Sequence, residues 1–445
     1  MTSLFKWYTV VSIISYTSEF DELVCRIYNT PMIRIHPSVL SGTVQAPASK
    51  EMAQRLLFAA SLPPTPTEIR NMPSCGDVET AADVLRRFGC RIKREGSSLT
   101  VEPFPKTNPA AVLSLDFGKS STAAGLGMST AAAYGFRANC RGSEQLTRQR
   151  MLPLTGKMAL RGVTFSSFSL PLEMQGRLEG GSYVFDGSEG SGFPASIMSV
   201  LPLLLDPSRV EIEGRLIDPE ILESEIRMLS HFGIRIESAG DRFERPGRQI
   251  YESPGVLICE NDWALSSLWI FAAALSAFRG SSVRVEGLQE SSAQKYRNIG
   301  QIISLFSQDF SDISVDMSPA PELSCLAAAA AAFKGARAHL FGIPELRKRG
   351  IDRLQAMCSV LNGLGCEASC GEDSITVTPS APLSVPEDAV IDCMDDAWIF
   401  MSMALCCGIA GRPYILRGER AAADIYEGFL EDLESLGGVF ETVKR

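Results

Sequence analysis

Histidine is scarce in this chain: its 445 residues include only His36, His231 and His339, and none of its 12 cysteines stands in a C-x-x-C pair. Because zinc sites need several such side chains at short, regular spacing, we expect no zinc site. Reduced thiols in a cytoplasmic protein are the simplest interpretation of the scattered cysteines. The sequence indicates no metal and no organic cofactor.

The chain also lacks an excess of basic residues. Its 42 lysines and arginines face 52 aspartates and glutamates, which gives a net charge of −10 at pH 7. Proteins that bind nucleic acid usually present a strongly basic surface, so no nucleic-acid partner is expected. Small anionic ligands are not excluded, because such a site needs only local cations.

The N-terminal region lacks a long hydrophobic run. Its apolar stretch, residues 7–16, is shorter than the roughly 20 residues that a membrane-spanning helix needs. It has no clear small-residue cleavage site and soon turns acidic, so residues 1–30 are interpreted as an extension rather than a signal peptide. No membrane partner is expected.

The length and composition favour an ordinary globular protein of two domains. Hydrophobic residues make up 45% and charged residues 21% of the chain, as is usual for globular proteins. A chain of 445 residues exceeds the size at which a single core keeps growing, so two domains of roughly 200 residues each are predicted.

A phrase of the form L-x-x-[FL]-G, followed by strand-like residues, occurs four times. Each copy follows a helical pattern, so each predicts a helix that ends at a glycine cap and leads into a strand. The glycines lie at multiples of about 70 residues, which predicts a structural repeat. The copies are "LRRFGCRI" (85–92), "LSHFGIRI" (229–236), "LNGLGCEA" (361–368) and "LESLGGVF" (433–440).

Two further copies are needed to complete the period. "MALRGVTF" (158–165) lies where one belongs, and the other falls near "IGQIISLFSQDF" (299–310), where the glycine is absent. Together these copies predict six α+β units, three in each domain.

The segment "APASKEMAQR" (46–55) places two cations at the start of a predicted helix. Ser49 is positioned to cap this helix, and Lys50 lies in its first turn, where the helix dipole disfavours a cation by a few tenths of a kcal/mol. A lysine on the surface would explain this pattern. The alternative is an anion site in which free N–H groups, the Ser49 hydroxyl and Lys50 converge on a phosphate or carboxylate.

At this point the chain resembles the enolpyruvyl transferases, and specifically the 5-enolpyruvylshikimate-3-phosphate synthase family. The resemblance covers about residues 32 to 440 and rests on the opening segment and on "LTRQRMLPL" (146–154), "VDMSPAPEL" (315–323) and "ELRKRGIDRL" (345–354). It implies an α/β (α+β) fold, a two-domain inverse α/β barrel of six βαβαββ units. One domain would comprise 1–47 with 261–445 and the other 48–260, with the active site in the cleft between them.

The family adds an acceptor hydroxyl to phosphoenolpyruvate and then eliminates phosphate. The resemblance therefore implies a monomeric enzyme of the shikimate pathway, with phosphoenolpyruvate and shikimate 3-phosphate as anionic substrates. It makes Lys50 and Glu322 the catalytic residues, with Glu322 as the base in place of the family's aspartate. The implied substrate-binding residues are Ser49, Arg55, Arg150, Ser191, Arg349, Arg353 and Asp396.

Several motifs depart from the family pattern at expected ligand contacts. Two expected cations are missing, and losing two hydrogen bonds to charged groups costs roughly 3 to 6 kcal/mol. Two alternatives thus stay open: a diverged transferase with another acceptor, and a catalytically silent relative. The departures are Glu51, Lys119, Gly125, Gly190, Gly192, Ala397, Trp398 and Asp424.

The related family that builds peptidoglycan precursors is favoured less, because Glu322 and the segment 345–354 fit the shikimate pattern better. Asp262, at the expected second crossing between domains, is predicted to cap a helix rather than to meet a ligand.

Overall fold

The computed structural model describes residues 32–106, 112–246, 248–277, 280–308, 310–347, 351–378, 386 and 389–443. The expected extension, residues 1–30, lies outside the described residues. Within them, no helix combines the length and the hydrophobicity that crossing a membrane requires.

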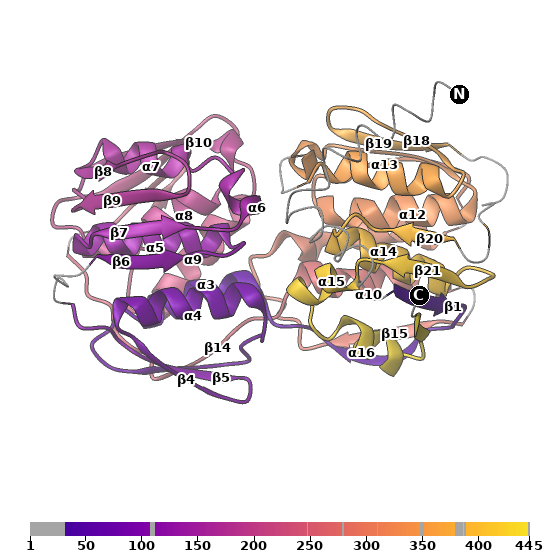
Figure 1. Ribbon diagram of the computed structural model, residues 1–445, viewed down its shortest axis with the longest axis horizontal. Coiled ribbons are helices and arrows are strands. Elements are labelled where there is room, and N and C mark those ends of the chain that lie inside the picture. Colours follow the sequence, from indigo (N-terminus) through magenta and orange to yellow (C-terminus); the bar gives the residue numbers. More distant parts are fainter. Residues whose placement is uncertain are drawn as a thin grey trace, which may run out of the picture.

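The chain forms two lobes side by side (Figure 1). One hydrophobic core draws its buried residues from Ala53 to Cys259, and the other from Ile33 to Val44 and from Leu265 to Leu436. We therefore propose domain boundaries near residues 47 and 261, and we call residues 48–260 the inserted lobe and the remainder the terminal lobe.

The two crossings between the lobes lie side by side. The Ser49 N–H donates to the Glu260 carbonyl at 2.9 Å, and the Asp262 N–H donates to the Pro47 carbonyl at 2.7 Å. Ala48 and Asn261 form an antiparallel bridge between these bonds. These contacts join the two crossing segments to each other directly before the helix that begins at Lys50.

Each sheet of the inserted lobe has four strands and the same pattern, with one parallel pair followed by two antiparallel pairs. The strand orders are β14 (Val256–Ile258), β3 (Thr67–Arg70), β5 (Ser98–Glu102), β4 (Arg91–Glu95); β6 (Leu113–Asp116), β7 (Ala138–Arg141), β9 (Leu172–Gly176), β8 (Val163–Phe165); and β10 (Ser182–Asp186), β11 (Arg209–Glu213), β13 (Arg242–Glu244), β12 (Glu237–Ala239).

Two sheets of the terminal lobe repeat this pattern, whereas the third has only two parallel strands in the part of the chain that the structure describes. The orders are β16 (Asp312–Asp316), β17 (Arg337–Phe341), β19 (Ser374–Thr378), β18 (Glu367–Cys370); β20 (Val390–Asp392), β21 (Tyr414–Arg417), β1 (Met32–His36), β22 (Val439–Val443); and β15 (Ser282–Glu286), β2 (Ser41–Gln45). Five of the six predicted units thus show the full four-stranded pattern, and the sixth shows two of its strands among the described residues.

Helices that are apolar on all sides form the interior of the lobes. Every residue of α14 (Ala397–Gly408) is buried, as a helix without a polar face requires. The helices of the inserted lobe are α3 (Lys50–Ala60), α4 (Gly76–Phe88), α5 (Ser121–Tyr134), α6 (Glu144–Thr147), α7 (Leu152–Ala159), α8 (Gly192–Met198) and α9 (Pro219–His231). Those of the terminal lobe, besides α14, are α10 (Trp263–Ser276), α11 (Gly300–Ser307), α12 (Ser324–Lys334), α13 (Arg353–Gly363), α15 (Glu419–Ile425) and α16 (Phe429–Ser435).

The glycine of the repeated phrase ends its helix as predicted. Gly89 caps α4 in the left-handed region, with φ of 104°, and β4 follows it. Gly233, Gly365 and Gly437 also have positive φ between a helix and a strand. A side chain is strained in this conformation, which explains why the phrase carries glycine at this position.

Candidate active site

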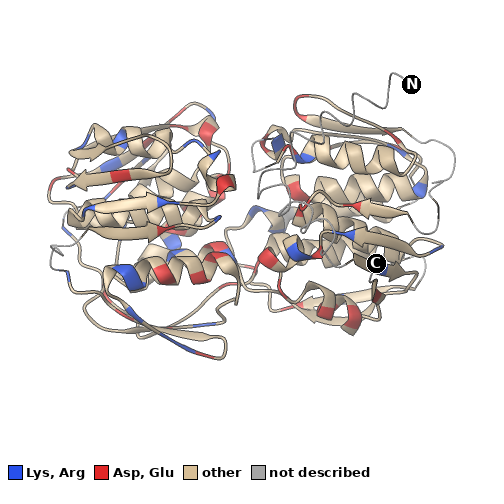
Figure 2. Cartoon of the chain, viewed as in Figure 1, with Lys and Arg blue, Asp and Glu red and all other residues tan. Residues whose placement is uncertain are grey.

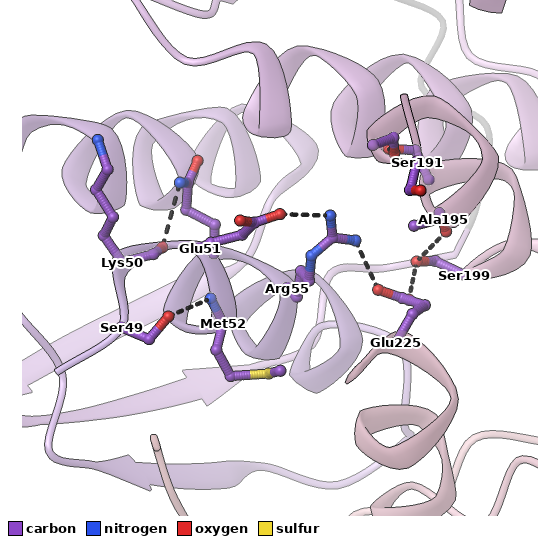
Figure 3. A network of polar contacts seen from close by, with 12 residues as sticks. Ser49, Lys50, Glu51, Met52, Arg55, Ser191, Ala195, Ser199 and Glu225 are labelled. Carbon is purple, nitrogen blue, oxygen red and sulfur yellow. Dashed lines mark hydrogen bonds and ion pairs between the residues drawn. The ribbon is translucent and has the colours of Figure 1, made fainter. Parts of the chain in front are cut away.

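The first turn of α3 follows a serine cap and begins with a lysine (Figure 3). The Ser49 hydroxyl accepts a hydrogen bond from the Met52 N–H at 3.3 Å and so caps the helix. Lys50 Nζ lies 2.7 Å from Asp77 Oδ2 at the start of α4, and both side chains are partly exposed. Asp77 holds the lysine at the boundary between the lobes, where it is accessible to solvent.

Arg55, one turn further along α3, lies inside the inserted lobe. Its Nη1 donates to Glu225 Oε2 at 2.7 Å and its Nη2 to Glu51 Oε1 at 3.0 Å (Figure 3). The Arg55 side chain is 2% exposed and that of Glu225 is 0% exposed. Burial alone would lower the pKa of Arg55, but the carboxylates of Glu225 and Glu51 outweigh it and raise that pKa. In this structure Arg55 is an interior ion-pair partner, and its expected contact with a substrate stays a prediction.

Glu225 was not expected from the sequence, although the pattern around it holds a signal. It lies three residues from both Leu222 and Met228, and all three side chains are buried on one face of α9. A carboxylate on the apolar face of a helix must be paired in the interior, and Ser199 Oγ also donates to it.

Glu322 is buried in the 3-10 turn Pro321–Leu323, immediately before α12. The Tyr296 hydroxyl donates to its Oε2, and the Glu322 N–H donates to the same hydroxyl oxygen at 3.2 Å. The carboxylate expected to act as the base is therefore fixed by a tyrosine from the turn Lys295–Asn298.

Arg353 and Asp396 form a second buried ion pair, at the starts of α13 and α14. Arg353 Nε donates to Asp396 Oδ2 at 2.8 Å. The other oxygen, Oδ1, accepts from the N–H groups of Trp398 and Ile399 and caps α14. Arg353 Nη1 is buried and has no hydrogen-bond partner among the described residues. Asp396 thus orients the Arg353 guanidinium, and the Nη1 group of that guanidinium can still bind an anion.

Arg353, Asp396 and Glu322 all act on the pKa of one buried thiol, that of Cys325. Burial raises the pKa of Cys325, Arg353 opposes this rise, and Asp396 and Glu322 add to it. All three charges therefore lie within electrostatic range of the start of α12. The positive ends of α13 and α14 add to the Arg353 charge at this point.

Charged residues of both signs lie along the edges where the lobes face each other (Figure 2). Lys295 Nζ, in the terminal lobe, lies 2.7 Å from Asp218 Oδ1 and 3.6 Å from Glu220 Oε1 in the inserted lobe. Lys119 Nζ lies 2.6 Å from Asp424 Oδ2 across the same boundary. The carboxylate that stands at the position of an expected cation, Asp424, is thus neutralised by Lys119.

The remaining predicted residues differ in their surroundings. The Ser191 hydroxyl is buried and donates to the Ile217 carbonyl at 2.5 Å, next to the Asp218 that pairs with Lys295. Arg150 is 73% exposed and lies 3.3 Å from Glu189. Arg349 lies outside the described residues. The facing edges therefore carry Lys50, Ser191 and the Lys295 turn beside Glu322, whereas Arg55 lies in the interior.

Asp262 caps α10, as predicted, with its Oδ1 accepting from the Leu265 N–H at 2.9 Å. Burial raises its pKa from 3.8 to about 6, although the Leu265 N–H and Lys50 oppose the rise. Between about pH 4 and pH 6 the folded state thus binds more protons than the unfolded state, so this group's contribution to stability falls as the pH rises.

Asp262→Asn is expected to remove this contribution while keeping a capping oxygen. The free energy of unfolding of the variant minus that of the unsubstituted protein should rise by roughly 1 to 2 kcal/mol from pH 4 to pH 7, after allowance for partial exposure. Urea unfolding of both proteins at the two pH values measures this change. A difference that is the same at both values would contradict the assignment.

These features define a two-lobed α/β protein in which charged residues gather where the lobes meet. The family model described as EPSP synthase (3-phosphoshikimate 1-carboxyvinyltransferase) matches residues 35–433. The chain belongs to the EPSP synthase family.

Similar proteins span almost the whole chain. It is 26% identical over 423 residues to a 3-phosphoshikimate 1-carboxyvinyltransferase of Clostridium kluyveri, which covers 91% of this chain and 97% of the relative. It is also 26% identical over 422 residues to the protein of that name from Paraburkholderia phymatum, covering 88% of this chain and 95% of the relative.

Two solved structures share the fold. EPSP synthase from Acinetobacter baumannii superimposes with a TM-score of 0.77 at 18% identity, covering 93% of this chain and 100% of that one. The enolpyruvyl transferase NikO from Streptomyces tendae gives a TM-score of 0.72 at 16% identity, covering 93% and 99%. The predicted fold class is confirmed.

Proposed function

We propose that the chain transfers the enolpyruvyl group of phosphoenolpyruvate to the 5-hydroxyl of shikimate 3-phosphate and releases inorganic phosphate. Family membership supports the reaction class, and the names of the relatives above support this acceptor. The observation that carries the proposal is the buried Nη1 of Arg353, which has no partner among the described residues and belongs to a guanidinium oriented by Asp396. A planar guanidinium in this state is suited to the carboxylate or phosphate of phosphoenolpyruvate.

Glu322 and Lys50 supply the proton transfers that this reaction needs. Glu322 accepts the proton of the acceptor hydroxyl as that oxygen attacks C2 of phosphoenolpyruvate. Lys50 donates a proton to the methylene carbon, which becomes a methyl group in the tetrahedral intermediate. The neutral Lys50 amine then takes a proton back from this methyl group as the C–O bond to phosphate breaks, which restores the methylene, and the proton held by Glu322 leaves with the phosphate. Because Lys50 begins α3 of the inserted lobe and Glu322 lies in the terminal lobe, the two groups would act from opposite sides of a substrate held between the lobes.

The binding residues form two groups. Arg353 and Arg349 belong to the phosphoenolpyruvate side, together with Arg150, which would exchange its exposed partner Glu189 for the substrate. Ser49 and Ser191 belong to the acceptor side, and Lys50 would contact both substrates. We further propose that the site lies between the two domains, and that the protein is a cytoplasmic monomer.

One observation favours a second candidate, a transferase with another acceptor. Arg55, which the resemblance assigns to the acceptor's carboxylate, is already paired with Glu225 and Glu51. An acceptor without a carboxylate would leave this buried pair intact, whereas shikimate 3-phosphate would have to compete with it.

Phosphate release separates the candidates. The protein is incubated with phosphoenolpyruvate alone, with shikimate 3-phosphate alone and with both, and the proposal expects release only with both. A transferase with another acceptor would release no phosphate, yet phosphoenolpyruvate would raise its melting temperature, less so as salt screens Arg150 and Arg353. A silent relative would show neither effect, and either result would refute the proposal.

A further inference from the structure

Tyr296 makes two hydrogen bonds to one residue, Glu322. Its hydroxyl donates to Oε2 of the carboxylate, and the same oxygen accepts from the Glu322 main-chain N–H. Tyr296 is 5% exposed and Glu322 is 6% exposed, so solvent competes little for these bonds. A glutamate has three side-chain torsions, and the phenol restricts them by holding one carboxylate oxygen while the backbone bond fixes the start of the side chain.

The preceding residue, Lys295, joins the same turn to the other lobe. Its ammonium pairs with Asp218 at 2.7 Å and Glu220 at 3.6 Å, both at the start of α9, and lies 5.9 Å from the centroid of the Tyr296 ring. Burial alone would lower the pKa of Lys295. The negative charges of Asp218 and, to a smaller extent, Glu322 outweigh burial and raise that pKa. One short turn thus carries a contact to the expected base and a contact to the facing lobe.

We infer that Tyr296 is a positioning residue for Glu322, and that the Lys295 ion pair holds the Tyr296 turn in place only while the two lobes are in contact. This inference rests on the proposed function, in which Glu322 is the base. A displacement of about 1 Å in a reacting group can lower a rate about a hundredfold. The tyrosine therefore acts on the chemical step, without touching the substrate.

Tyr296→Phe tests the inference because it removes the hydroxyl and keeps the ring. We expect kcat to fall about tenfold to a hundredfold, with the KM values for both substrates within about twofold and the melting temperature nearly unchanged. Lys295→Met should lower kcat in the same direction, and the double variant should fall no further than the stronger single one. The matched control is Tyr183→Phe, a buried tyrosine whose hydroxyl donates to the Glu179 carbonyl in the inserted lobe; it should leave kcat unchanged.

Adding Tyr296→Phe to the Glu322→Gln variant and measuring the residual rate separates positioning of the carboxylate from a merely structural role of Tyr296. Tyr296→Phe should have no further effect in that background, because the carboxylate that it positions is gone. An unchanged kcat for Tyr296→Phe alone, or an equal loss in both backgrounds, would overturn the inference. An inactive unsubstituted protein would instead overturn the proposed function and this inference with it.

Discussion

Lys50→Met is expected to lower phosphate release at least about a hundredfold, because general acid–base groups contribute about 10² to 10⁴ to such reactions. Methionine keeps the length of the side chain and removes its charge and its proton. The fold should stay intact, since the lost pair with Asp77 is partly exposed and contributes about 1 kcal/mol or less. Steady-state assays with both substrates, together with the melting temperature, measure the two effects.

Lys93→Met is the matched control for this prediction. Lys93 also pairs with a carboxylate, Glu95, but on the exposed strand β4 of the same lobe. It should keep the full rate. Equal rates for the two variants would show that Lys50 is a surface lysine and would remove it from the site.

Glu225→Ala is expected to destabilise the protein by about 3 to 5 kcal/mol, because it leaves the Arg55 charge buried. Glu51 alone would remain to neutralise this guanidinium, and its own side chain is 46% exposed. For a lobe of this size the loss corresponds to a fall in melting temperature of roughly 6 to 20 °C. Thermal unfolding followed by circular dichroism measures it.

Two further variants separate charge burial from general damage to α9. Glu223→Ala removes the exposed partner of Arg227 on the same helix and should cost less than about 1 kcal/mol. Combining Arg55→Met with Glu225→Leu replaces both charges by apolar side chains and should restore much of the lost stability. A single Glu225→Ala variant as stable as the unsubstituted protein would contradict the buried pair.

Much of the fold could be predicted because its signals are local. A glycine that ends a helix is required by backbone geometry, so the phrase around Gly89 marks each helix–strand junction wherever it recurs. The copy without glycine, in residues 299–310, marks a unit that departs from the common pattern. It lies in the one unit whose sheet has two strands among the described residues, β2 and β15.

The site was less predictable because its charges are paired across long separations. The partner of Arg55 lies 170 residues further along the chain, so no local pattern around α3 indicates that the guanidinium is neutralised. Tyr296 likewise gave no sequence signal, since only the fold brings its turn against Glu322. Motif matching assigns chemistry to single positions, whereas burial and pairing depend on the whole lobe.

The identity of the product tests the central claim most directly. Phosphorus NMR of stoichiometric amounts of the protein, phosphoenolpyruvate and shikimate 3-phosphate should show the phosphoenolpyruvate signal replaced by inorganic phosphate, and the shikimate 3-phosphate signal replaced by one new phosphomonoester. Mass spectrometry should find the enolpyruvyl group on that new compound. Unchanged signals, or inorganic phosphate with shikimate 3-phosphate intact, would contradict enolpyruvyl transfer to this acceptor.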